Sequence, residues 1–339
     1  MTDTLIRGAA PDAGAAGGPF VRPDVRGFLD YLASVPGPKT HEGTPETARA
    51  LYHAMKDVAD PPVGTLGFVK DLSIPGPHGA IPARLFDPRE TREPGPVVVF
   101  FHGGGFVIGN IDTHASFTAE MARQLDLPVV SVDYRLAPEA KWPAAPEDCE
   151  IAARWVGSNP AELERVATSL VLCGDSAGGT LTITTAMALR DRAADVPVIV
   201  QAPIYPAADM SNDYPSFSDF ADGFLLTRDT MIWFAEHYQA DTADYRGSPM
   251  AGSLAGLPPA VIITASLDPI RDQGRAYAAA LILAGVPVTY REAVGNIHGF
   301  ITLRQAIPSS AGDVAGYLSA LKDAIVEAEG ERVMRQAAG

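Results

Sequence analysis

Cysteine, long apolar runs and an export-type leader are what this sequence most clearly lacks. It has two cysteines in 339 residues, Cys149 and Cys173, so a disulfide-stabilised fold is not expected. Cys173 ends an apolar segment, so we predict that it is a small buried residue with a free thiol. Few cysteines and no expected disulfide are typical of a protein of the reducing cytoplasm. No apolar run approaches the roughly 18–20 residues that span a bilayer. The opening residues Met1–Thr4 lack the basic and apolar regions of a signal peptide, so we expect neither membrane insertion nor export.

Basic residues are also scarce. Lys and Arg together number 26 against 41 Asp and Glu, which gives a formal net charge of −15. This balance disfavours nucleic acid and anionic membrane surfaces as partners. A metal site is not expected either, because five histidines have no carboxylate or cysteine partner at metal-ligand spacing: His41, His53, His78, His114 and His237.

The hydrophobic pattern is typical of a globular α/β protein. Hydrophobic residues make up 47% of the chain, and its length suits one α/β domain with an added lid. After two edge-type strands at 66–75 and 81–86, buried strands and helices alternate, which predicts a mostly parallel sheet covered on both faces. We expect buried strands near 96–101, 128–133, 169–174, 198–204, 260–266 and 288–293, and helices near 112–125, 146–156, 178–193, 271–285 and 311–328.

Two parts of the chain fall outside this alternation. The first 19 or so residues are rich in Ala, Gly and Pro and are expected to be mobile, and amphipathic segments follow at 25–35 and 44–59. More than fifty residues then separate the strand ending near Ile204 from the one beginning at Ala260, and an insertion of this length after a strand is typical of an active-site lid. The predicted organisation is an N-terminal cap segment at 1–60, a core at 61–204 and 257–339, and a cap insertion at 205–256.

A serine stands between two glycines in Gly174–Gly178, after an apolar segment and before a helical one. This arrangement is the nucleophile elbow of α/β-hydrolases, in which the serine lies at the tip of a tight turn. Ser176 is therefore the predicted nucleophile, held at positive φ, and small neighbours let the strand and helix approach each other around it. Because the motif also arises by chance in glycine-rich chains, two further segments matter.

The first of these is His102–Gly105, directly after the apolar segment 97–101. Glycines that leave a buried strand can turn backbone N–H groups toward a neighbouring site. In an α/β-hydrolase such a loop supplies part of the oxyanion hole, and the residue after the nucleophile supplies the remaining N–H. Gly103, Gly104 and Ala177 are the expected donors.

The second contains the base and the acid. His298 follows a strand-like segment near the C-terminus, and Asp268 ends an earlier apolar strand. The order Ser176, Asp268, His298 is that of α/β-hydrolases and differs from the chymotrypsin and subtilisin orders. Asp272 lies four residues after Asp268, and the residues alone leave either one as the acid.

With these motifs the chain resembles the hormone-sensitive-lipase-like (family IV) carboxylesterases of the α/β-hydrolase superfamily. The resemblance implies Ser176 as nucleophile, His298 as base and Asp268 as acid, with Asp272 in the first turn of the next helix. It also implies that His102 positions the glycine loop and is not a second base. The matching segments are His102–Gly105, Tyr134–Glu139, Gly174–Gly179, Asp268–Asp272 and His298–Phe300, in the family's order.

The resemblance further implies hydrolysis of short- to medium-chain carboxylic esters through an acyl-enzyme, without metal or cofactor, and raises a homodimer as an expectation. The two cap segments would shape the substrate pocket, and Tyr205, Phe224 and Leu225 are the predicted lining residues. Most other apolar residues of 227–238, such as Met231 and Phe234, are expected to form the core of the cap itself.

Other functions are compatible with parts of this pattern. Amide or carbamate hydrolysis uses the same triad. A ligand-binding protein on a disabled hydrolase scaffold is a rival from another class, and the plant gibberellin receptors, which lack the catalytic histidine, illustrate it. Because Ser176, Asp268, His298 and the whole glycine loop are present, the sequence favours the enzyme. An interaction module with a vestigial triad has no supporting feature.

Overall fold

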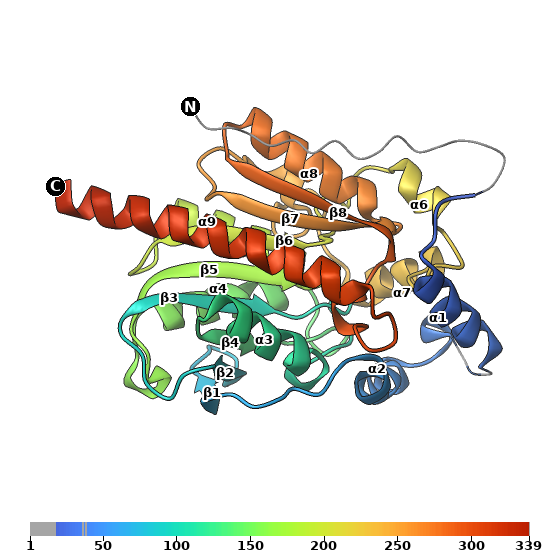
Figure 1. The fold of residues 1–339 in the computed structure, drawn as a ribbon. Coiled ribbons are helices and arrows are strands. Elements are labelled where there is room, and N and C mark those ends of the chain that lie inside the picture. Colours follow the sequence, from blue (N-terminus) through green and yellow to red (C-terminus); the bar gives the residue numbers. More distant parts are fainter. Residues whose placement is uncertain (1–17, 36, 38, 339) are drawn as a thin grey trace.

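Eight strands form one sheet with helices on both faces (Figure 1) in the computed structural model, which describes residues 18–35, 37 and 39–338. The mobility expected for the first 19 residues concerns a segment that lies almost wholly outside the described residues. The α/β-hydrolase fold class predicted from the alternating pattern is confirmed. The strands are β1 (Phe68–Ile74), β2 (Ile81–Asp87), β3 (Gly95–Phe101), β4 (Val129–Val132), β5 (Ala167–Asp175), β6 (Val198–Ile204), β7 (Ala260–Leu267) and β8 (Val288–Ile297).

The strand order across the sheet is β1-β2-β4-β3-β5-β6-β7-β8. β2 pairs antiparallel with both β1 and β4, and every other pair is parallel. The central strands are buried on both faces and carry continuous apolar runs, as in Leu170–Cys173, because helices cover them on each side. The order places β5, and the serine that follows it, in the middle of the sheet.

Helices cover the two faces in separate layers. The helices α3 (Ile111–Leu125) and α9 (Ser310–Ala338) pack on one face, where Phe117 and Tyr317 are buried. The other face is covered by α4 (Ala144–Gly157), α5 (Ala177–Asp191) and α8 (Arg271–Leu283), with Tyr277 among its fully buried side chains. Short 3₁₀ turns η1 (Thr40–Glu42), η2 (Ala161–Leu163), η3 (Pro249–Ala251) and η4 (Phe300–Thr302) complete the described chain.

Four helices from the two predicted cap segments gather at one end of the sheet (Figure 1): α1 (Pro23–Ser34), α2 (Pro45–Ala59), α6 (Pro215–Asp219) and α7 (Arg228–Tyr238). This is the end at which the parallel strands have their carboxyl termini. The side chain of Thr44 accepts a hydrogen bond from the Thr47 amide, so α2 begins where an N-cap is expected. Within the described ranges, no helix combines the length and the apolarity needed to span a membrane.

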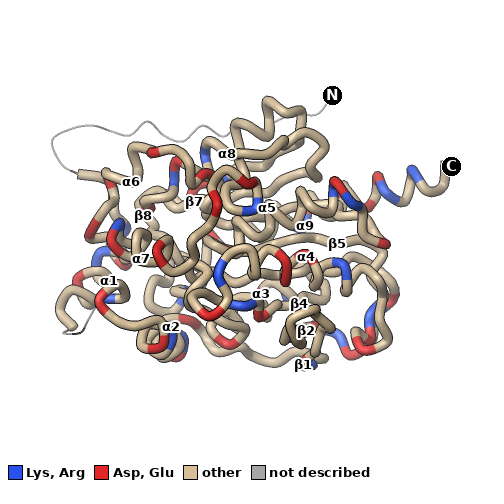
Figure 2. The backbone as a smooth tube through the Cα atoms, turned by 180° about the vertical axis from the view of Figure 1, so that it is seen from behind, with Lys and Arg blue, Asp and Glu red and all other residues tan. Residues whose placement is uncertain are grey.

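The last helix is longer than its apolar pattern predicts. The expected range ends at 328, close to Ile325, which is the last fully buried residue of the helix. The helix nevertheless continues to Ala338, and its outer turns carry Glu329–Arg332 and Glu331–Arg335 pairs at helical spacing. Figure 2 shows both charge signs side by side along this end of α9. Apolar periodicity could not have predicted this extension, because charged pairs line it instead of core contacts.

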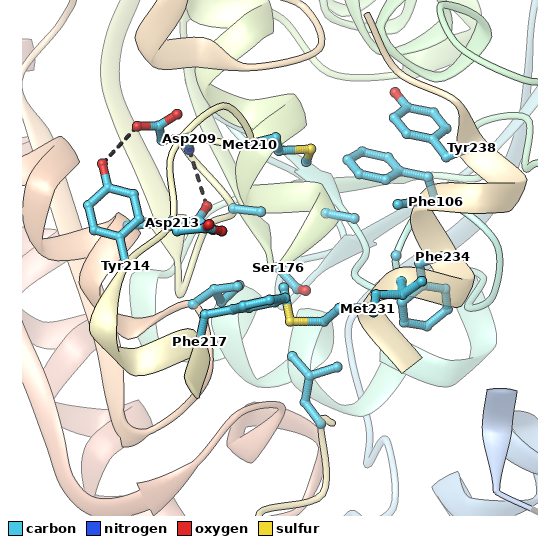
Figure 3. Close-up of a pocket in the computed structure, with 18 of the residues that line it drawn as sticks. Phe106, Ser176, Asp209, Met210, Asp213, Tyr214, Phe217, Met231, Phe234 and Tyr238 are labelled. Carbon is cyan, nitrogen blue, oxygen red and sulfur yellow. Dashed lines mark hydrogen bonds between the residues drawn. The ribbon is translucent and has the colours of Figure 1, made fainter. Parts of the chain in front are cut away.

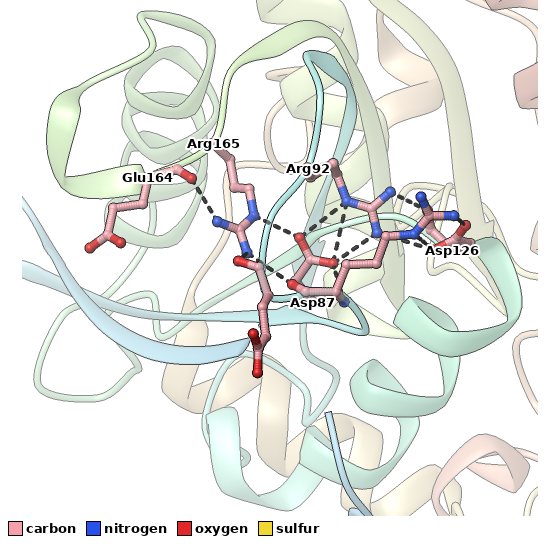
Figure 4. Close-up of polar contacts among 7 residues, drawn as sticks. Asp87, Arg92, Asp126, Glu164 and Arg165 are labelled. Atoms are coloured by element: carbon pink, nitrogen blue, oxygen red, sulfur yellow. Dashed lines mark hydrogen bonds and ion pairs between the residues drawn. The ribbon is translucent and has the colours of Figure 1, made fainter. Parts of the chain in front are cut away.

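A buried carboxylate lies at the opposite end of the sheet from Ser176. Asp87 ends β2 and is fully buried, and it accepts hydrogen bonds from Arg92 Nη2 at 2.8 Å and Arg165 Nε at 2.7 Å (Figure 4). Arg165 also lies over the ring of Phe68, 4.4 Å from its centroid. Burial opposes ionisation of Asp87, but the guanidinium groups and the Arg89 amide outweigh it and lower its pKa. The cluster therefore joins the end of β2 to the segments that enter β3 and β5.

Replacing Asp87 with alanine is expected to cost about 3–5 kcal/mol of unfolding free energy, because two largely buried guanidinium groups lose the carboxylate that they share and only Arg92 keeps another carboxylate, Asp126, among the described residues. The depressed pKa means that the ionised carboxylate stabilises the fold above its unfolded pKa of about 3.9 and less as the pH falls through the lower folded value. The difference between wild type and Asp87→Ala in urea unfolding should therefore shrink below about pH 4. Asp71→Ala is the control, because this carboxylate pairs with Arg84 but is 74% exposed and should cost under about 1 kcal/mol. Equal losses for the two variants would contradict the prediction.

Candidate active site

Ser176 lies between the end of β5 and the start of α5, as the motif predicts. Its φ is 54° and its ψ is −118°, a strained conformation for a residue with a Cβ. Its amide donates to the carbonyl of Ile204 at 2.9 Å, which holds the turn against the neighbouring strand β6. A Cβ at Gly178 would overlap the carbonyl of Phe101, so the close approach of α5 to β3 requires glycine there.

The structure brings the three predicted triad residues together. His298 Nε2 lies 2.8 Å from Ser176 Oγ, and His298 Nδ1 lies 2.7 Å from Asp268 Oδ2. Asp268 is fully buried, and its other oxygen accepts the Ile270 amide at 2.9 Å, which fixes the plane of the carboxylate. His298 is held between the two partners on the segment that leaves β8. This is the nucleophile–base–orienting acid geometry that acyl transfer requires.

Asp272 does not take part in this chain of hydrogen bonds. It is the second residue of α8, and it accepts from Arg271 Nε at 2.8 Å and from the amide of Ser216 at 3.0 Å. Burial opposes its ionisation, but its hydrogen bond and charge pairing with Arg271 outweigh this and lower its pKa. The structure therefore separates the two candidate acids, and only Asp268 contacts His298.

The glycine loop departs from the predicted set of donors. The Gly103 amide already donates to Asp175 Oδ1 at 2.7 Å, and Gly103 does not line the space around Ser176. The expectation that Gly103 is an oxyanion donor is therefore wrong, because a buried carboxylate occupies its N–H. Gly104 and Gly105 do line that space, and no hydrogen bond within the described chain occupies their amides. Ala177 has the first N–H of α5, which lacks an intrahelical acceptor.

His102 precedes this loop and contacts its backbone. It is fully buried, its Nδ1 lies 2.8 Å from the carbonyl of Gly103, and its ring stacks on Tyr134 at 4.3 Å. Burial, and then the neighbouring His114, lower the pKa of His102 to about 3, so it is neutral at physiological pH. The Tyr134 hydroxyl donates to the carbonyl of His102 at 2.6 Å. These contacts make His102 a scaffold residue, as expected.

Two cavities meet at Ser176. The larger, of about 260 Å³, extends under α7 and the segment between β6 and α6. The smaller, of about 140 Å³, contains His298 and is also lined by Met55 of α2. Gly105, Leu226 and Phe234 line both cavities. The two cavities therefore form one continuous space, with Ser176 where they join.

The predicted pocket residues are only partly right. Leu225 lines the smaller cavity. Phe224 lines neither cavity; its ring packs against Phe220 with centroids 5.3 Å apart. Tyr205 is 1% exposed and lies beneath the site, with its ring centroid 4.5 Å from that of His298. Both are corrections: the direction of these side chains depends on neighbours that are distant in the sequence.

Helix α7 contributes more to the larger cavity than the sequence predicts. Met231, Phe234 and Tyr238 lie on one face of this helix and line the larger cavity (Figure 3). Trp233 does not line it and is buried in the hydrophobic core. The expectation that most of these residues form only the core of the cap is therefore wrong. Their spacing of three and four residues is a signal that could have found them, because it places them on one side of a helix.

The larger cavity has an apolar side and a polar side. Opposite α7, Asp209 accepts the Tyr214 hydroxyl at 2.7 Å (Figure 3). It also accepts Asn212 Nδ2 at 2.8 Å. Burial opposes ionisation of Asp209, but these neutral donors outweigh it and lower its pKa. Asp213 also lines this side, and none of the described Lys and Arg residues lines either cavity. Throughout the described ranges, no three His, Cys, Asp or Glu side chains converge to hold a metal ion.

Comparisons with known proteins agree with this geometry. A family model of the alpha/beta hydrolase fold matches residues 98–302. The carboxylic ester hydrolase LipN of Mycobacterium tuberculosis is 41% identical over 264 residues, which cover 75% of this chain and 70% of that protein. The esterase LipI of the same organism is 37% identical over 269 residues, covering 77% and 83%.

A solved structure shows the same likeness in three dimensions. The hyperthermophilic esterase from the archaeon Pyrobaculum calidifontis matches with a TM-score of 0.83 at 35% identity, over 89% of this chain and 98% of that one. The match thus extends well beyond the catalytic motifs to the arrangement of most of the molecule. The chain belongs to the hormone-sensitive-lipase-like (family IV) carboxylesterases of the α/β-hydrolase superfamily.

Proposed function

We propose that this protein is a serine carboxylesterase that cleaves short- to medium-chain esters, with Ser176 as nucleophile, His298 as general base and acid, and Asp268 as the orienting carboxylate. As a member of its family the chain is a carboxylic ester hydrolase. The observation that carries the mechanism is the continuous hydrogen-bonded chain from Asp268 through His298 to Ser176, which ends where two cavities meet.

The reaction proceeds in two steps. Ser176 Oγ attacks the ester carbonyl while His298 Nε2 accepts its proton, and Asp268 keeps the imidazole in the required tautomer. The tetrahedral intermediate collapses when His298 returns that proton to the leaving alcohol, which gives the acyl-enzyme. Water then attacks the acyl carbon with His298 again as base, and the acid product leaves Ser176 free.

Gly104, Gly105 and Ala177 are the amides that we assign to the oxyanion. Ala177 and Gly105 line the larger cavity and Gly104 lines the smaller one, so the three bracket Ser176. Preorganised donors of this kind stabilise the charge that develops on the carbonyl oxygen, by roughly 3–4 kcal/mol each. The change from the expected set removes Gly103, whose amide has another acceptor, and adds Gly105.

The two cavities receive the two halves of the substrate. His298 must protonate the leaving oxygen, so the alcohol belongs in the smaller cavity, which His298 lines. The acyl chain then extends into the larger cavity toward Phe217 and Met231. Its volume of about 260 Å³ lies below the roughly 300–1,000 Å³ typical of drug-sized ligand sites. This space favours a short or medium acyl chain over a long one.

Hydrolysis of p-nitrophenyl esters from acetate to palmitate tests this function. We expect kcat/KM to be highest at short to medium chains and to fall steeply for longer ones, because the larger cavity cannot bury them. Phe217→Ala should move the optimum to longer acyl chains and leave the preference for the alcohol unchanged. Met55→Ala, in the smaller cavity, is the matched control and should do the reverse.

Two outcomes would contradict this assignment of the cavities. Palmitate as the best substrate would contradict the limit on chain length. If Phe217→Ala changed the alcohol preference instead of the acyl preference, the larger cavity would bind the alcohol and the smaller cavity the acyl chain. No ester hydrolysis by well-folded protein, together with cleavage of the matching anilides, would point to an amide as the substrate.

A cytoplasmic location and a homodimer also belong to this proposal. The location is supported by the two cysteines, Cys149 and Cys173, which are both free and buried. The homodimer stays a prediction from the family resemblance, and sedimentation of the purified protein tests it.

A further inference from the structure

Asp175 is a buried charged group that the proposed reaction leaves without a role. It ends β5 immediately before Ser176 and is 3% exposed. It borders the smaller cavity, yet both of its carboxylate oxygens accept hydrogen bonds from groups of the protein. Buried carboxylates elsewhere in this chain, such as Asp87 and Asp148, pair with arginine, whereas no Arg or Lys of the described residues pairs with Asp175.

The first contact of Asp175 reaches the glycine loop. Its Oδ1 accepts the Gly103 amide at 2.7 Å, across 72 positions of sequence. A Cβ on Gly103 would overlap the same carboxylate, so the loop lies directly against Asp175 and only glycine fits there. Gly103 immediately precedes Gly104 and Gly105, so this hydrogen bond determines where the two following amides point.

The second contact reaches the surroundings of the base. Asp175 Oδ2 accepts the hydroxyl of Tyr205 at 3.3 Å. The ring of Tyr205 lies against the imidazole of His298, with centroids 4.5 Å apart and planes inclined by 50°. Tyr205 has a φ of 31°, an unusual value for a bulky residue, which the surrounding contacts must maintain.

The third polar group beside Asp175 is the imidazole of His114. His114 Nε2 of α3 lies 3.2 Å from Asp175 Oδ1, and His114 Nδ1 lies 2.9 Å from the hydroxyl of Thr113. Both histidine nitrogens thus have polar neighbours, and the ring is fully buried. Polar groups of the glycine loop, of the segment after β6 and of α3 therefore converge on Asp175.

From these contacts we infer that Asp175 is a positioning residue for catalysis: one carboxylate sets the oxyanion loop through Gly103 and supports His298 through Tyr205. It does not exchange protons with the substrate. Its effect is to keep the oxyanion amides and the base at fixed positions relative to Ser176, where a displacement of about 1 Å can cost about 100-fold in rate. This inference rests on the proposed acyl transfer by Ser176.

Three substitutions separate the contributions of the two carboxylate oxygens of Asp175. Asp175→Ala removes both acceptors, and we expect kcat for p-nitrophenyl butyrate to fall about 10- to 100-fold with KM within about threefold of wild type. Asp175→Asn keeps an acceptor for the Gly103 amide, so its kcat should lie between those of the wild type and Asp175→Ala. Tyr205→Phe keeps the ring on His298 but loses the hydroxyl, and should lower kcat by less than either.

Binding of a trifluoromethyl ketone provides a readout that a purely structural role would not change. This inhibitor forms an oxyanion adduct with the serine, so its affinity should fall in Asp175→Ala by about the same factor as kcat. Asp87→Ala is the control for lost stability, because its buried carboxylate lies at the far end of the sheet. It should unfold more easily than wild type but keep wild-type kcat and inhibitor affinity.

Two results for the Asp175 variants would overturn the inference. If Asp175→Ala kept kcat and inhibitor affinity within twofold of wild type, or raised KM alone, the inference would be overturned. The same holds if Asp175→Asn were no better than Asp175→Ala. Should Asp175→Ala not fold, the ranking of wild type, Tyr205→Phe and Asp175→Asn decides the question. A wild-type protein without esterase activity would instead refute the proposed function itself.

Discussion

Ser176→Ala is expected to lower kcat for p-nitrophenyl esters by at least about 10⁵-fold, because it removes the proposed nucleophile that attacks the carbonyl and forms the acyl-enzyme. The substitution retains the Cβ and therefore the same constraint at φ 54°. It loses one hydrogen bond, to His298, so the free energy of unfolding should change by no more than about 1 kcal/mol.

The matched control is Ser169→Ala. Ser169 is a buried serine at the other end of the same strand, and its hydroxyl donates to Glu329, far from the site. This variant should keep wild-type kcat. A fluorophosphonate probe should label wild type and Ser169→Ala and leave Ser176→Ala unlabelled. Labelling or wild-type turnover in folded Ser176→Ala would remove Ser176 from the mechanism.

Asp268→Asn is expected to lower kcat by about 10⁴-fold, because an amide can present a donor to His298 Nδ1 and favour the wrong tautomer of the imidazole. Asn can still accept the Ile270 amide through its carbonyl oxygen, so the fold should be retained. Steady-state kinetics with a p-nitrophenyl ester measure the loss, and thermal unfolding checks that the variant is folded.

Asp272→Asn supplies the comparison for that experiment. Its carboxylate lies four residues away and faces Arg271 and the amide of Ser216, without contact to His298. We expect a loss in kcat of no more than about tenfold, through small shifts of α8. A larger loss for Asp272→Asn than for Asp268→Asn would reassign the acid of the triad.

The sequence predicts the fold, and the three residues that the structure brings together at the site, because local patterns specify both. A strand, a tight turn and a helix around Ser176 form an elbow whatever surrounds them. Alternating apolar segments give the strand positions, since each buried strand must be covered on both faces. The chain order of Ser176, Asp268 and His298, read together with the family resemblance, was enough to select the three residues that the structure brings together.

The errors concern contacts between segments that are far apart in the chain. Gly103 appeared to be a free donor because nothing in its own motif indicates that Asp175 accepts its amide. Tyr205 was predicted to line the pocket, but in the structure its ring lies against the imidazole of His298, on a backbone with an unusual φ of 31°. A charged residue at the end of an apolar strand, as at Asp175, was the one local signal of this arrangement.

The amino-acid sequence by itself therefore determined the α/β-hydrolase architecture and the positions of the nucleophile elbow and the glycine loop, because turn geometry and hydrophobic periodicity act over a few neighbouring positions; the choice of Asp268 as the acid of the proposed triad also needed the family resemblance. Only the tertiary structure decided which glycine amides remain available to an oxyanion and which face of α7 lines the larger cavity. Those outcomes depend on how β3, β5 and the cap approach one another. The hydrogen bonds and packing that control this approach form between residues tens of positions apart.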